Sequence, residues 1–344
     1  MGKKFGFGVI GCGGIGAHHA KCINSLEEAI LVAMADLSEE RGKKLAEEHN
    51  VKYYRDYQKM LQREDIDIID VCTPSGMHGE HTIAAAKAGK HVICEKPIEI
   101  DLKKADLMIK TCEESKVKLA VIFQHRFRQS SFRLRDAILK GKLGRLVLAD
   151  AYVKWYRTQG YYDETNWRGT LSLDGGACLI NQSVHSIDLL QWMMGPVETV
   201  FSNIATLTHK IEGEDVATAL LRFKSGALGV IEGSTSCYPG FPERLEIYGD
   251  KGGVIISGDK IDAWKLSEKE EKEEEAGVKE MGSGASDPMA IGLGGHSAQI
   301  QDMINAIKED KSPLVDGKEG RKSLEIVLAI YASARKKKII HLPL

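Results

Sequence analysis

Short apolar runs alternate with amphipathic segments along the first 123 residues. The apolar runs cover residues 5–10, 30–36, 66–72, 91–94 and 117–123. Segments with helical periodicity lie between them, at residues 15–28, 38–49, 77–88 and 101–115. Strands that alternate with helices of this length are typical of parallel strands joined by right-handed crossovers. The pattern therefore predicts a doubly wound α/β domain over residues 1–123.

A different pattern follows residue 123. Strand-like runs come one after another, at residues 146–155, 197–207, 216–223, 227–236, 244–248, 253–257 and 261–266. Helical patterns lie at residues 131–140, 183–194, 296–308 and 320–336. Because short turn sequences such as Lys224-Ser225-Gly226 join neighbouring strands, hairpins and an antiparallel sheet are favoured. We expect an α+β domain over residues 124–344 with an open, mainly antiparallel sheet.

Composition excludes several classes of protein. The 344 residues carry 47 basic and 49 acidic side chains, and this balance gives no electrostatic footprint for nucleic acid or an anionic membrane. No apolar run approaches the roughly 18 residues of a membrane span. The seven cysteines are odd in number and contain no Cys-x-x-Cys pair, which argues against disulfides or a zinc knuckle. We expect a cytoplasmic protein with no metal site, no nucleic-acid partner and no membrane contact.

A glycine pattern after the first strand predicts a dinucleotide site. Gly11-Cys12-Gly13-Gly14-Ile15-Gly16 follows an apolar run and opens a helical one, as the Gly-x-Gly-x-x-Gly turn requires. Gly11 permits the tight turn, Gly13 lets a pyrophosphate approach the backbone, and Gly16 allows close packing of helix and strand. The predicted phosphate-binding residues are Gly11, Gly13, Gly14, Ile15 and Gly16.

Asp36 ends the second predicted strand, twenty residues after Gly16. A carboxylate at this point can accept hydrogen bonds from both ribose hydroxyls of NAD and would repel the 2′-phosphate of NADP. We therefore expect NAD as the cofactor. NADP stays an alternative, because Arg41 or Lys43 could accommodate a phosphate.

Ligands of parallel sheets bind beyond the carboxyl ends of the strands. The third and fourth strands of the pattern end at Cys72-Thr73-Pro74-Ser75 and Glu95-Lys96-Pro97. The candidate cofactor residues at this edge are Thr73, Pro74, His78, Glu95 and Lys96. For His78 and His81, which begin the next helix, helix capping or a surface position is the alternative. His296 opens a later helix and could reach the ligand crevice, although helix capping or solvent exposure is the favoured interpretation.

Four motifs, in this order, resemble the glucose–fructose oxidoreductase / inositol dehydrogenase / MocA (Gfo/Idh/MocA) family. They are the glycine turn, Cys72-Thr73-Pro74, Glu95-Lys96-Pro97, and Gly175-Gly176 followed by Asn181-x-x-x-His185-x-x-Asp188. The resemblance covers essentially the whole chain. It implies a Rossmann domain followed by an α+β domain, and NAD(P)-dependent oxidation or reduction of a sugar or cyclitol. It also implies homodimers or homotetramers formed through the C-terminal sheet.

Oxidation of a secondary hydroxyl to a ketone requires hydride transfer to nicotinamide and removal of the hydroxyl proton. Lys96 near the nicotinamide suits a hydrogen bond to the hydroxyl or removal of its proton, since desolvation and the positive ring both lower the pKa of the amine. His185 is a base near neutral pH, and Asn181, four residues earlier, shares its face of a helix. Many family members carry Asp at the position of Asn181, and Asn cannot accept a proton. We expect His185 as the main base and Lys96 as the polarising group, with the reverse left open, and Asp188 orients the imidazole or caps the helix.

An aromatic and arginine-rich stretch precedes the Gly175-Gly176 motif. It contains Trp155-Tyr156-Arg157, Tyr161-Tyr162 and Asn166-Trp167-Arg168. Aromatic faces pack against sugar C–H surfaces and arginine binds carboxylate or phosphate in a bidentate way, although packing between domains is the alternative. The candidate substrate-binding residues are Lys96, Arg157, Tyr161, Asn181 and His185. The resemblance adds Arg168 as a cofactor contact, and Arg126 is interpreted as an ion-pair partner.

Three functions share this fold: a sugar or cyclitol dehydrogenase, a non-catalytic NAD(P)-binding sugar sensor, and an NAD-dependent glycosidase. Lys96 and His185 favour an enzyme over a sensor. The glycosidase relatives carry a Tyr/His signature that residues 175–188 do not match. We expect a dehydrogenase that acts on the secondary hydroxyl of a sugar, a uronic acid, a nucleotide sugar or a cyclitol.

Overall fold

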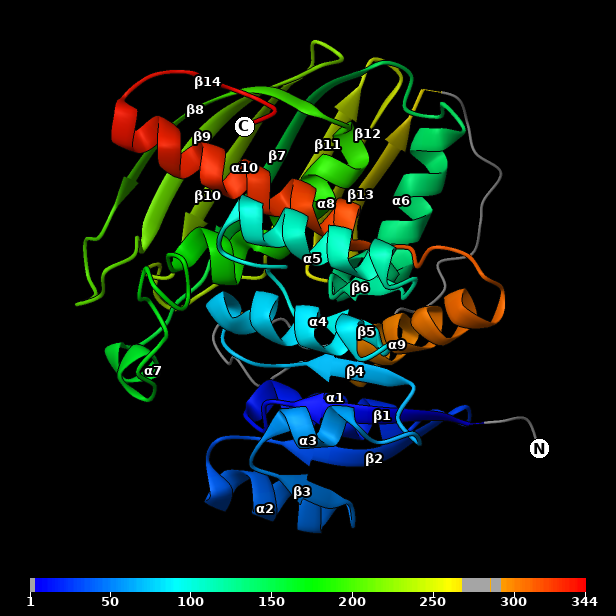
Figure 1. The fold of residues 1–344 in the computed structure, drawn as a ribbon. Coiled ribbons are helices and arrows are strands. Elements are labelled where there is room, and N and C mark those ends of the chain that lie inside the picture. The colour runs from blue at the N-terminus through cyan, green and yellow to red at the C-terminus, as the bar shows by residue number, and fades with distance from the viewer. Residues whose placement is uncertain (1–3, 268–284, 286–291) are drawn as a thin grey trace. The chain divides into compact units, whose positions relative to one another are not determined.

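The computed structural model describes residues 4–267, 285 and 292–344. The chain divides into two compact units (Figure 1). The first comprises Met1–Gln124 with Leu293–Arg321, and the second comprises His125–Gly292 with Lys322–Leu344. The sequence-based division assigned all of residues 124–344 to one domain, whereas the structure places Leu293–Arg321 in the first unit.

The first unit is a six-stranded parallel sheet in the order β3-β2-β1-β4-β5-β6. Its strands are β1 (Phe5–Ile10), β2 (Ala29–Ala35), β3 (Lys52–Tyr54), β4 (Ile68–Val71), β5 (His91–Cys94) and β6 (Leu119–Val121). Its helices are α1 (Gly14–Asn24), α2 (Glu39–Glu48), α3 (Tyr57–Leu61), α4 (His78–Lys87), α5 (Leu102–Glu114) and α9 (Leu293–Lys308). This is the strand order of a dinucleotide-binding sheet, so the predicted α/β domain is confirmed.

Helix α9 belongs to this unit because of the apolar face it buries. Ile300, Met303 and Ile304, at helical spacing, are fully buried in the same hydrophobic cluster as Val9 of β1 and Ile23 of α1. A helix late in the chain thus completes the core beside α1. Local periodicity predicts such a helix but not the sheet against which it packs.

The second unit is an eight-stranded mixed sheet in the order β13-β12-β11-β7-β10-β9-β8-β14. The pair β7 and β10 is parallel and the remaining neighbours are antiparallel, which confirms the expected mainly antiparallel sheet. The strands are β7 (Leu146–Lys154), β8 (Val197–Ala205), β9 (Val216–Phe223), β10 (Leu228–Ser234), β11 (Arg244–Gly249), β12 (Gly252–Ser257), β13 (Lys260–Leu266) and β14 (Ile340–His341). The helices are α6 (Gln129–Leu139), α7 (Gln159–Asp163), α8 (Val184–Met194) and α10 (Gly317–Lys336), the last of which belongs to this unit from Lys322 onward.

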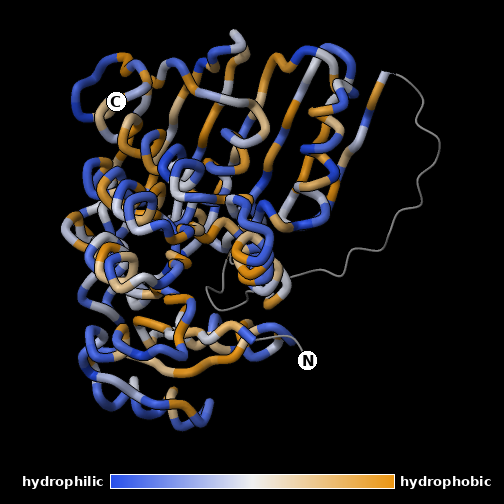
Figure 2. Tube along the Cα trace, turned by 45° about the vertical axis from the view of Figure 1, so that its right-hand side comes forward, coloured by the Kyte–Doolittle hydropathy of each residue, from blue (hydrophilic) through white to orange (hydrophobic). Residues whose placement is uncertain are grey.

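The two faces of this sheet differ. Helices α8 and α10 lie on one face (Figure 1), where alternate residues such as Leu221 and Ile231 are buried. On the other face the register pairs Phe201 with Leu220 and Leu228 with Leu148, and all four side chains are substantially exposed. Figure 2 shows hydrophobic residues concentrated on the strands, whereas the turns are mostly hydrophilic.

Candidate active-site residues

The glycine turn between β1 and α1 has the geometry of a phosphate-binding turn. Gly11 has a φ of 101°, and a Cβ atom on it would lie 2.6 Å from the carbonyl oxygen of Cys72. A Cβ atom on Gly16 would lie 1.9 Å from the carbonyl oxygen of Gly11, so both positions require glycine. Gly13 precedes α1, and a Cβ atom there would meet nothing within 4 Å. The first N–H groups of α1, from Gly14 onward, therefore have room for an anion.

Asp36 lies directly after β2 and fixes this turn. Its Oδ2 atom accepts hydrogen bonds from Cys12 N at 2.7 Å and Arg41 Nε at 3.1 Å. Its Oδ1 atom accepts from Ser38 N and Arg41 Nη2, both at 2.8 Å. The predicted ribose acceptor thus has four donors already, about as many as a carboxylate can accept. Ribose hydroxyls would have to displace the half-exposed Arg41, while Lys43 pairs with Glu39 instead.

His78 and His81, the two histidines after β4, both bond to Thr73. His78 Nδ1 lies 2.7 Å from the carbonyl oxygen of Pro97, and its Nε2 atom lies 2.8 Å from that of Thr73. His81 Nδ1 lies 3.1 Å from Thr73 Oγ1. Both rings are buried, which lowers the pKa of each, that of His81 to about 4. Neither is a surface histidine, and His78 joins the segments that follow β4 and β5. Pro74 directly precedes the short 3₁₀ turn Ser75–Met77, which lies between β4 and α4.

Glu95 and Lys96 follow β5. Lys96 is half-buried, and its backbone N–H donates to Glu95 Oε2 at 3.0 Å. Glu95 Oε1 lies 3.0 Å from His19 Nε2, and His19 Nδ1 lies 2.7 Å from Asp70 Oδ2. Sequence reasoning missed His19 and Asp70. The available signal was the spacing of His19, three residues after Gly16 on the buried side of a helix.

His296 is buried rather than capping or exposed. Its Nδ1 atom lies 3.2 Å from His18 Nε2, and its Nε2 atom lies 3.9 Å from Glu95 Oε1. Within the described residues, His19, Glu95 and His296 converge closely enough to be considered as metal ligands. Carboxylates already engage both ring nitrogens of His19, however, and a hydrogen-bonded network accounts for the arrangement.

In the second unit, Asn181 and His185 lie on one helical segment with a change of pitch. Residues Cys178–Ser183 form a π-helical turn, and α8 begins at Val184. Asn181 is therefore not one regular α-helical turn from His185, as the four-residue spacing had suggested. The His185 ring is buried and stacks on His125 with a centroid distance of 4.6 Å. Asn181 Nδ2 donates to Asp174 Oδ1 at 2.7 Å.

A distant carboxylate holds the π-helical turn. Glu214 accepts hydrogen bonds from Leu179 N at 2.7 Å, Ala177 N at 3.3 Å and the Tyr331 hydroxyl at 2.9 Å. Glu214 is buried, and burial raises its pKa. These contacts join residues far apart in sequence, so no local signal could have predicted them.

Asp188 does not orient His185. Its carboxylate receives two hydrogen bonds of 2.7 Å from the guanidinium of Arg126 and one of 2.8 Å from the Ser323 hydroxyl. The alternative roles as an imidazole-orienting group or a helix cap are therefore wrong. The interpretation of Arg126 as an ion-pair partner is confirmed.

Gln182, which sequence reasoning missed, connects three predicted substrate residues. Its Oε1 atom accepts from Arg157 Nη2 at 3.0 Å, and its Nε2 atom donates to the Tyr161 hydroxyl oxygen at 2.8 Å and to Asn181 Oδ1 at 3.3 Å. Arg157 is buried, which lowers its pKa, and it stacks over Trp155 at 5.0 Å. The structure thus places a guanidinium, a phenol and an amide together.

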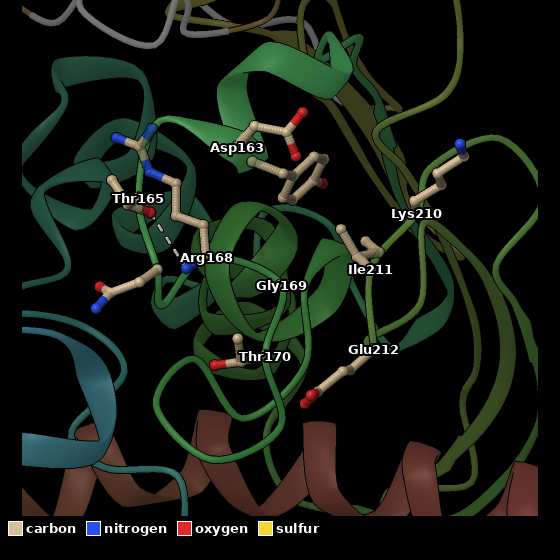
Figure 3. A pocket seen from close by; sticks show the side chains of 10 residues that line it. Asp163, Thr165, Arg168, Gly169, Thr170, Lys210, Ile211 and Glu212 are labelled. Carbon is tan, nitrogen blue, oxygen red and sulfur yellow. Dashed lines mark hydrogen bonds between the residues drawn. The ribbon is translucent and has the colours of Figure 1, made fainter.

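Arg168 belongs to the second unit, whereas the other predicted cofactor residues belong to the first. Its guanidinium lies 4.1 Å from the centre of the Tyr161 ring and donates to Tyr161 O at 2.9 Å and to Glu164 at 3.2 Å. It lines a pocket of about 350 Å³ (Figure 3). The pocket residues are Tyr162, Asp163, Thr165, Asn166, Arg168, Gly169, Thr170, Lys210, Ile211 and Glu212.

These features define a class of protein. A parallel sheet in dinucleotide-binding order carries a glycine turn at a helix N-terminus, and a second unit carries histidine, amide and arginine side chains suited to a polar substrate. This is a nicotinamide-dependent oxidoreductase.

Comparison with known protein families agrees with this class of enzyme. The NAD-binding Rossmann domain of the Gfo/Idh/MocA oxidoreductases matches residues 5–123, and the C-terminal domain of the same family matches residues 132–255. The chain belongs to the Gfo/Idh/MocA oxidoreductase family. The predictions of the family, of NAD as cofactor and of an oxidoreductase are confirmed.

Individual relatives cover the whole chain. The WlbA dehydrogenase of Bordetella pertussis, in complex with NADH and UDP-GlcNAcA, is 34% identical with a TM-score of 0.89, over 99% of this chain and 100% of that one. The WlbA dehydrogenase of Chromobacterium violaceum, with the same ligands, is 32% identical with a TM-score of 0.89. That match covers 100% of this chain and 97% of the other. The myo-inositol 2-dehydrogenase of Thermotoga maritima is 29% identical over 97% of this chain and 98% of its own length. No helix among the described residues is long and apolar enough to cross a membrane.

Proposed function

We propose that the protein is an NAD-dependent dehydrogenase that oxidises a secondary hydroxyl of a UDP-linked N-acetylated hexuronic acid. The observation that carries this proposal is the similarity to the WlbA dehydrogenase bound to NADH and UDP-GlcNAcA, at 34% identity over essentially both chains. The sequence also favours a uronic acid or a nucleotide sugar if Arg157 binds an anion.

The buried group around Gln182 supports an acidic substrate. The planar guanidinium of Arg157 matches the geometry of a carboxylate. It now donates to the carbonyl oxygens of Tyr156 and Ala285 and to Gln182 Oε1, so a substrate carboxylate would replace one of these acceptors. Tyr161 and Asn181 add hydrogen-bonding groups in the same network. A uronic acid offers the carboxylate and several hydroxyls, so it uses both kinds of group.

The catalytic roles follow from the chemistry of the side chains. When bound, NAD⁺ accepts the hydride of the carbinol carbon. His185 takes the hydroxyl proton as that carbon becomes a carbonyl. Lys96 donates a hydrogen bond to the same oxygen, and Asn181, held by Asp174, positions the hydroxyl. The hydroxyl proton goes to His185 and the hydride to the bound cofactor, so the two-electron oxidation to the ketone balances with no reactant besides NAD⁺.

A cyclitol is the second candidate substrate, because the similarity to the myo-inositol 2-dehydrogenase also extends over nearly the whole chain. Cyclitols have no carboxylate. The requirement for Arg157 therefore separates the two candidates.

We further propose that the protein is a cytoplasmic homodimer or homotetramer formed through the exposed sheet face that carries Phe201, Leu220 and Leu228. Substantially exposed apolar side chains at register-paired positions are typical of an interface. Analytical ultracentrifugation tests this: Leu220→Arg is expected to yield monomers, and an unchanged oligomer would contradict it.

The proposed cytoplasmic location is supported by the cysteines. All seven are free thiols, which agrees with a reducing compartment.

Incubation of the protein with NAD⁺ and a matched panel tests the substrate. The panel consists of UDP-GlcNAcA, UDP-GlcNAc, which lacks the carboxylate, and myo-inositol. We expect NADH and a product two hydrogens lighter with UDP-GlcNAcA, and much less with the other two. Oxidation of myo-inositol alone would favour the cyclitol candidate. Release of UDP without net NADH would indicate a glycosidase, and binding without any reaction would indicate a sensor.

A further inference from the structure

His19 lies at the centre of a buried polar network in the first unit. It sits on α1, five residues after the helix begins, and its side chain has no exposed surface. Its two ring nitrogens face Asp70 of β4 at 2.7 Å and Glu95, directly after β5, at 3.0 Å. One imidazole therefore connects the helix that follows the glycine turn with two neighbouring strands.

The geometry defines the protonation state of His19. Carboxylates are hydrogen-bond acceptors, so each ring nitrogen must carry a proton to bond to both of them. Burial alone would lower the pKa of His19, but the Asp70 carboxylate outweighs burial and holds the pKa well above its usual range. Burial would raise the pKa of Glu95, but the hydrogen bond from His19 lowers it. One cation thus lies between two buried anions.

The network reaches Lys96 through Glu95. One oxygen of Glu95 faces His19, and the other accepts the backbone N–H of Lys96 at 3.0 Å. The position of this carboxylate fixes the peptide that carries the Lys96 side chain. On the other side, His78 lies 2.7 Å from the carbonyl oxygen of Pro97. The segment that presents Lys96 is held at both ends by buried side chains.

We propose that His19 is a positioning residue for the reaction: as an imidazolium between Asp70 and Glu95, it holds Glu95 and, through it, the backbone of Lys96. This inference rests on the role of Lys96 in the proposed function. Because His19 is part of α1, the helix whose N-terminus carries the glycine turn is mechanically linked to the polarising lysine. The other titratable groups at these carboxylates are the Cys72 thiol, 3.6 Å from Asp70 Oδ1, and His296, whose Nε2 atom lies 3.9 Å from Glu95 Oε1. A neutral side chain at position 19 would remove the cation that lies between Asp70 and Glu95 and would raise the pKa of these buried carboxylates.

The protonation of His19 can be measured without substrate or cofactor. In ¹⁵N-histidine NMR spectra of the full chain, the His19 signals, assigned by their loss in His19→Gln, should still show two protonated nitrogens at a pH where ordinary histidines have lost one proton. Ordinary histidines titrate near pH 6.5. Titration of His19 in that ordinary range would overturn the proposal. One equivalent of zinc in the purified protein would also overturn it, since a metal would replace a ring proton.

Kinetics test the positioning role. His19→Gln should reduce kcat about tenfold or more while the KM for NAD⁺ changes less, and the pH profile of kcat should gain an ionisation that the wild-type profile, governed by the His185 base, does not show. The matched control is His18→Gln, one residue earlier on α1 and hydrogen-bonded to His296 instead of Glu95. It should keep the wild-type pH profile. Combined with Lys96→Met, the His19 substitution should add little, because both act on one group.

The outcomes separate this inference from the proposed function. If Lys96→Met is inactive and His19→Gln keeps the wild-type pH profile, or adds its full effect to Lys96→Met, the inference fails and the function stands. If Lys96→Met turns over normally, the assignment of Lys96 fails instead. Should His19→Gln not fold, Glu95→Gln removes the same charge pair and should likewise lower kcat; unchanged kcat would overturn the inference.

Discussion

The guanidinium of Arg126 and the carboxylate of Asp188 form a fully buried ion pair with two hydrogen bonds of 2.7 Å. Asp188 lies on α8, three residues after His185, and also accepts the hydroxyl of Ser323 from α10. The Arg126 side chain stacks on Trp192 of the same helix α8 at 5.1 Å. The helix that presents the proposed base is therefore anchored by a charge pair rather than by apolar packing alone.

Removal of one member of this pair should destabilise the protein strongly. Arg126→Met leaves a buried carboxylate without its cation, and such changes cost about 3–5 kcal/mol. The free energy of unfolding in urea measures this cost. The double variant Arg126→Met/Asp188→Leu should recover part of the loss, because no charge stays buried. A loss below about 1 kcal/mol for Arg126→Met would contradict the account.

The choice between NAD and NADP should depend on the pair of Asp36 and Arg41. Asp36→Ser removes the carboxylate that repels a 2′-phosphate and releases Arg41 to bind it. The ratio of kcat/KM for NADP over NAD should rise about tenfold or more. The control is Asp36→Ser/Arg41→Ala, which should lose most of that gain. An unchanged ratio of kcat/KM for NADP over NAD in Asp36→Ser would show that Asp36 does not discriminate between the two cofactors.

Arg157 should matter for acidic substrates alone. Arg157→Gln keeps a polar side chain beside Gln182 but removes the charge that a uronic acid carboxylate requires. The KM for UDP-GlcNAcA should rise about tenfold or more, and any residual turnover of UDP-GlcNAc should keep its KM. Equal changes for both substrates would assign Arg157 to packing.

An amide at position 181 can donate a hydrogen bond to Asp174, and Asn181 Nδ2 lies 2.7 Å from Asp174 Oδ1. Asn181→Asp would place two carboxylates in contact, so one must bind a proton. At neutral pH, kcat/KM should fall by about tenfold, and Asp174→Asn in the same chain should restore much of it. Full activity of Asn181→Asp alone would contradict this relationship.

His81 should make the protein less stable in acid. Its pKa is lowered by burial from 6.5 to about 4, so the folded state resists protonation that the unfolded state accepts. The contribution of neutral His81 to the free energy of unfolding is therefore fully present above pH 6.5. It is lost as the pH falls toward about 4, and the loss amounts to roughly 3 kcal/mol. His81→Gln should flatten the urea-unfolding free energy over this range. An unchanged slope would show that His81 does not carry the effect.

The elements predicted correctly have a local cause. The strand β1 and the glycine turn follow from an apolar run and from steric needs at Gly11 and Gly16 that neighbouring residues create. The long helices α5 and α8 follow from periodicity within one segment. The short elements β3 and α3 were missed, because three to five residues are too few to show a period.

The parts that escaped prediction depend on distant residues. Glu214 holds the π-helical turn from 35 positions beyond Leu179, and His19 meets Glu95 across 76 positions. Single side chains in such contacts leave no repeating pattern in the sequence. The chemical types at the proposed site could therefore be named in advance, but not the carboxylates and amides that orient them.

The most direct test of the central claim is a single-turnover experiment with stoichiometric protein, NAD⁺ and UDP-GlcNAcA deuterated at the sugar ring carbons. The account predicts that NADH absorbance appears, that the nicotinamide carries one deuterium, and that the sugar becomes a ketone. If the protein binds both NAD⁺ and UDP-GlcNAcA but no NADH forms, the account is contradicted.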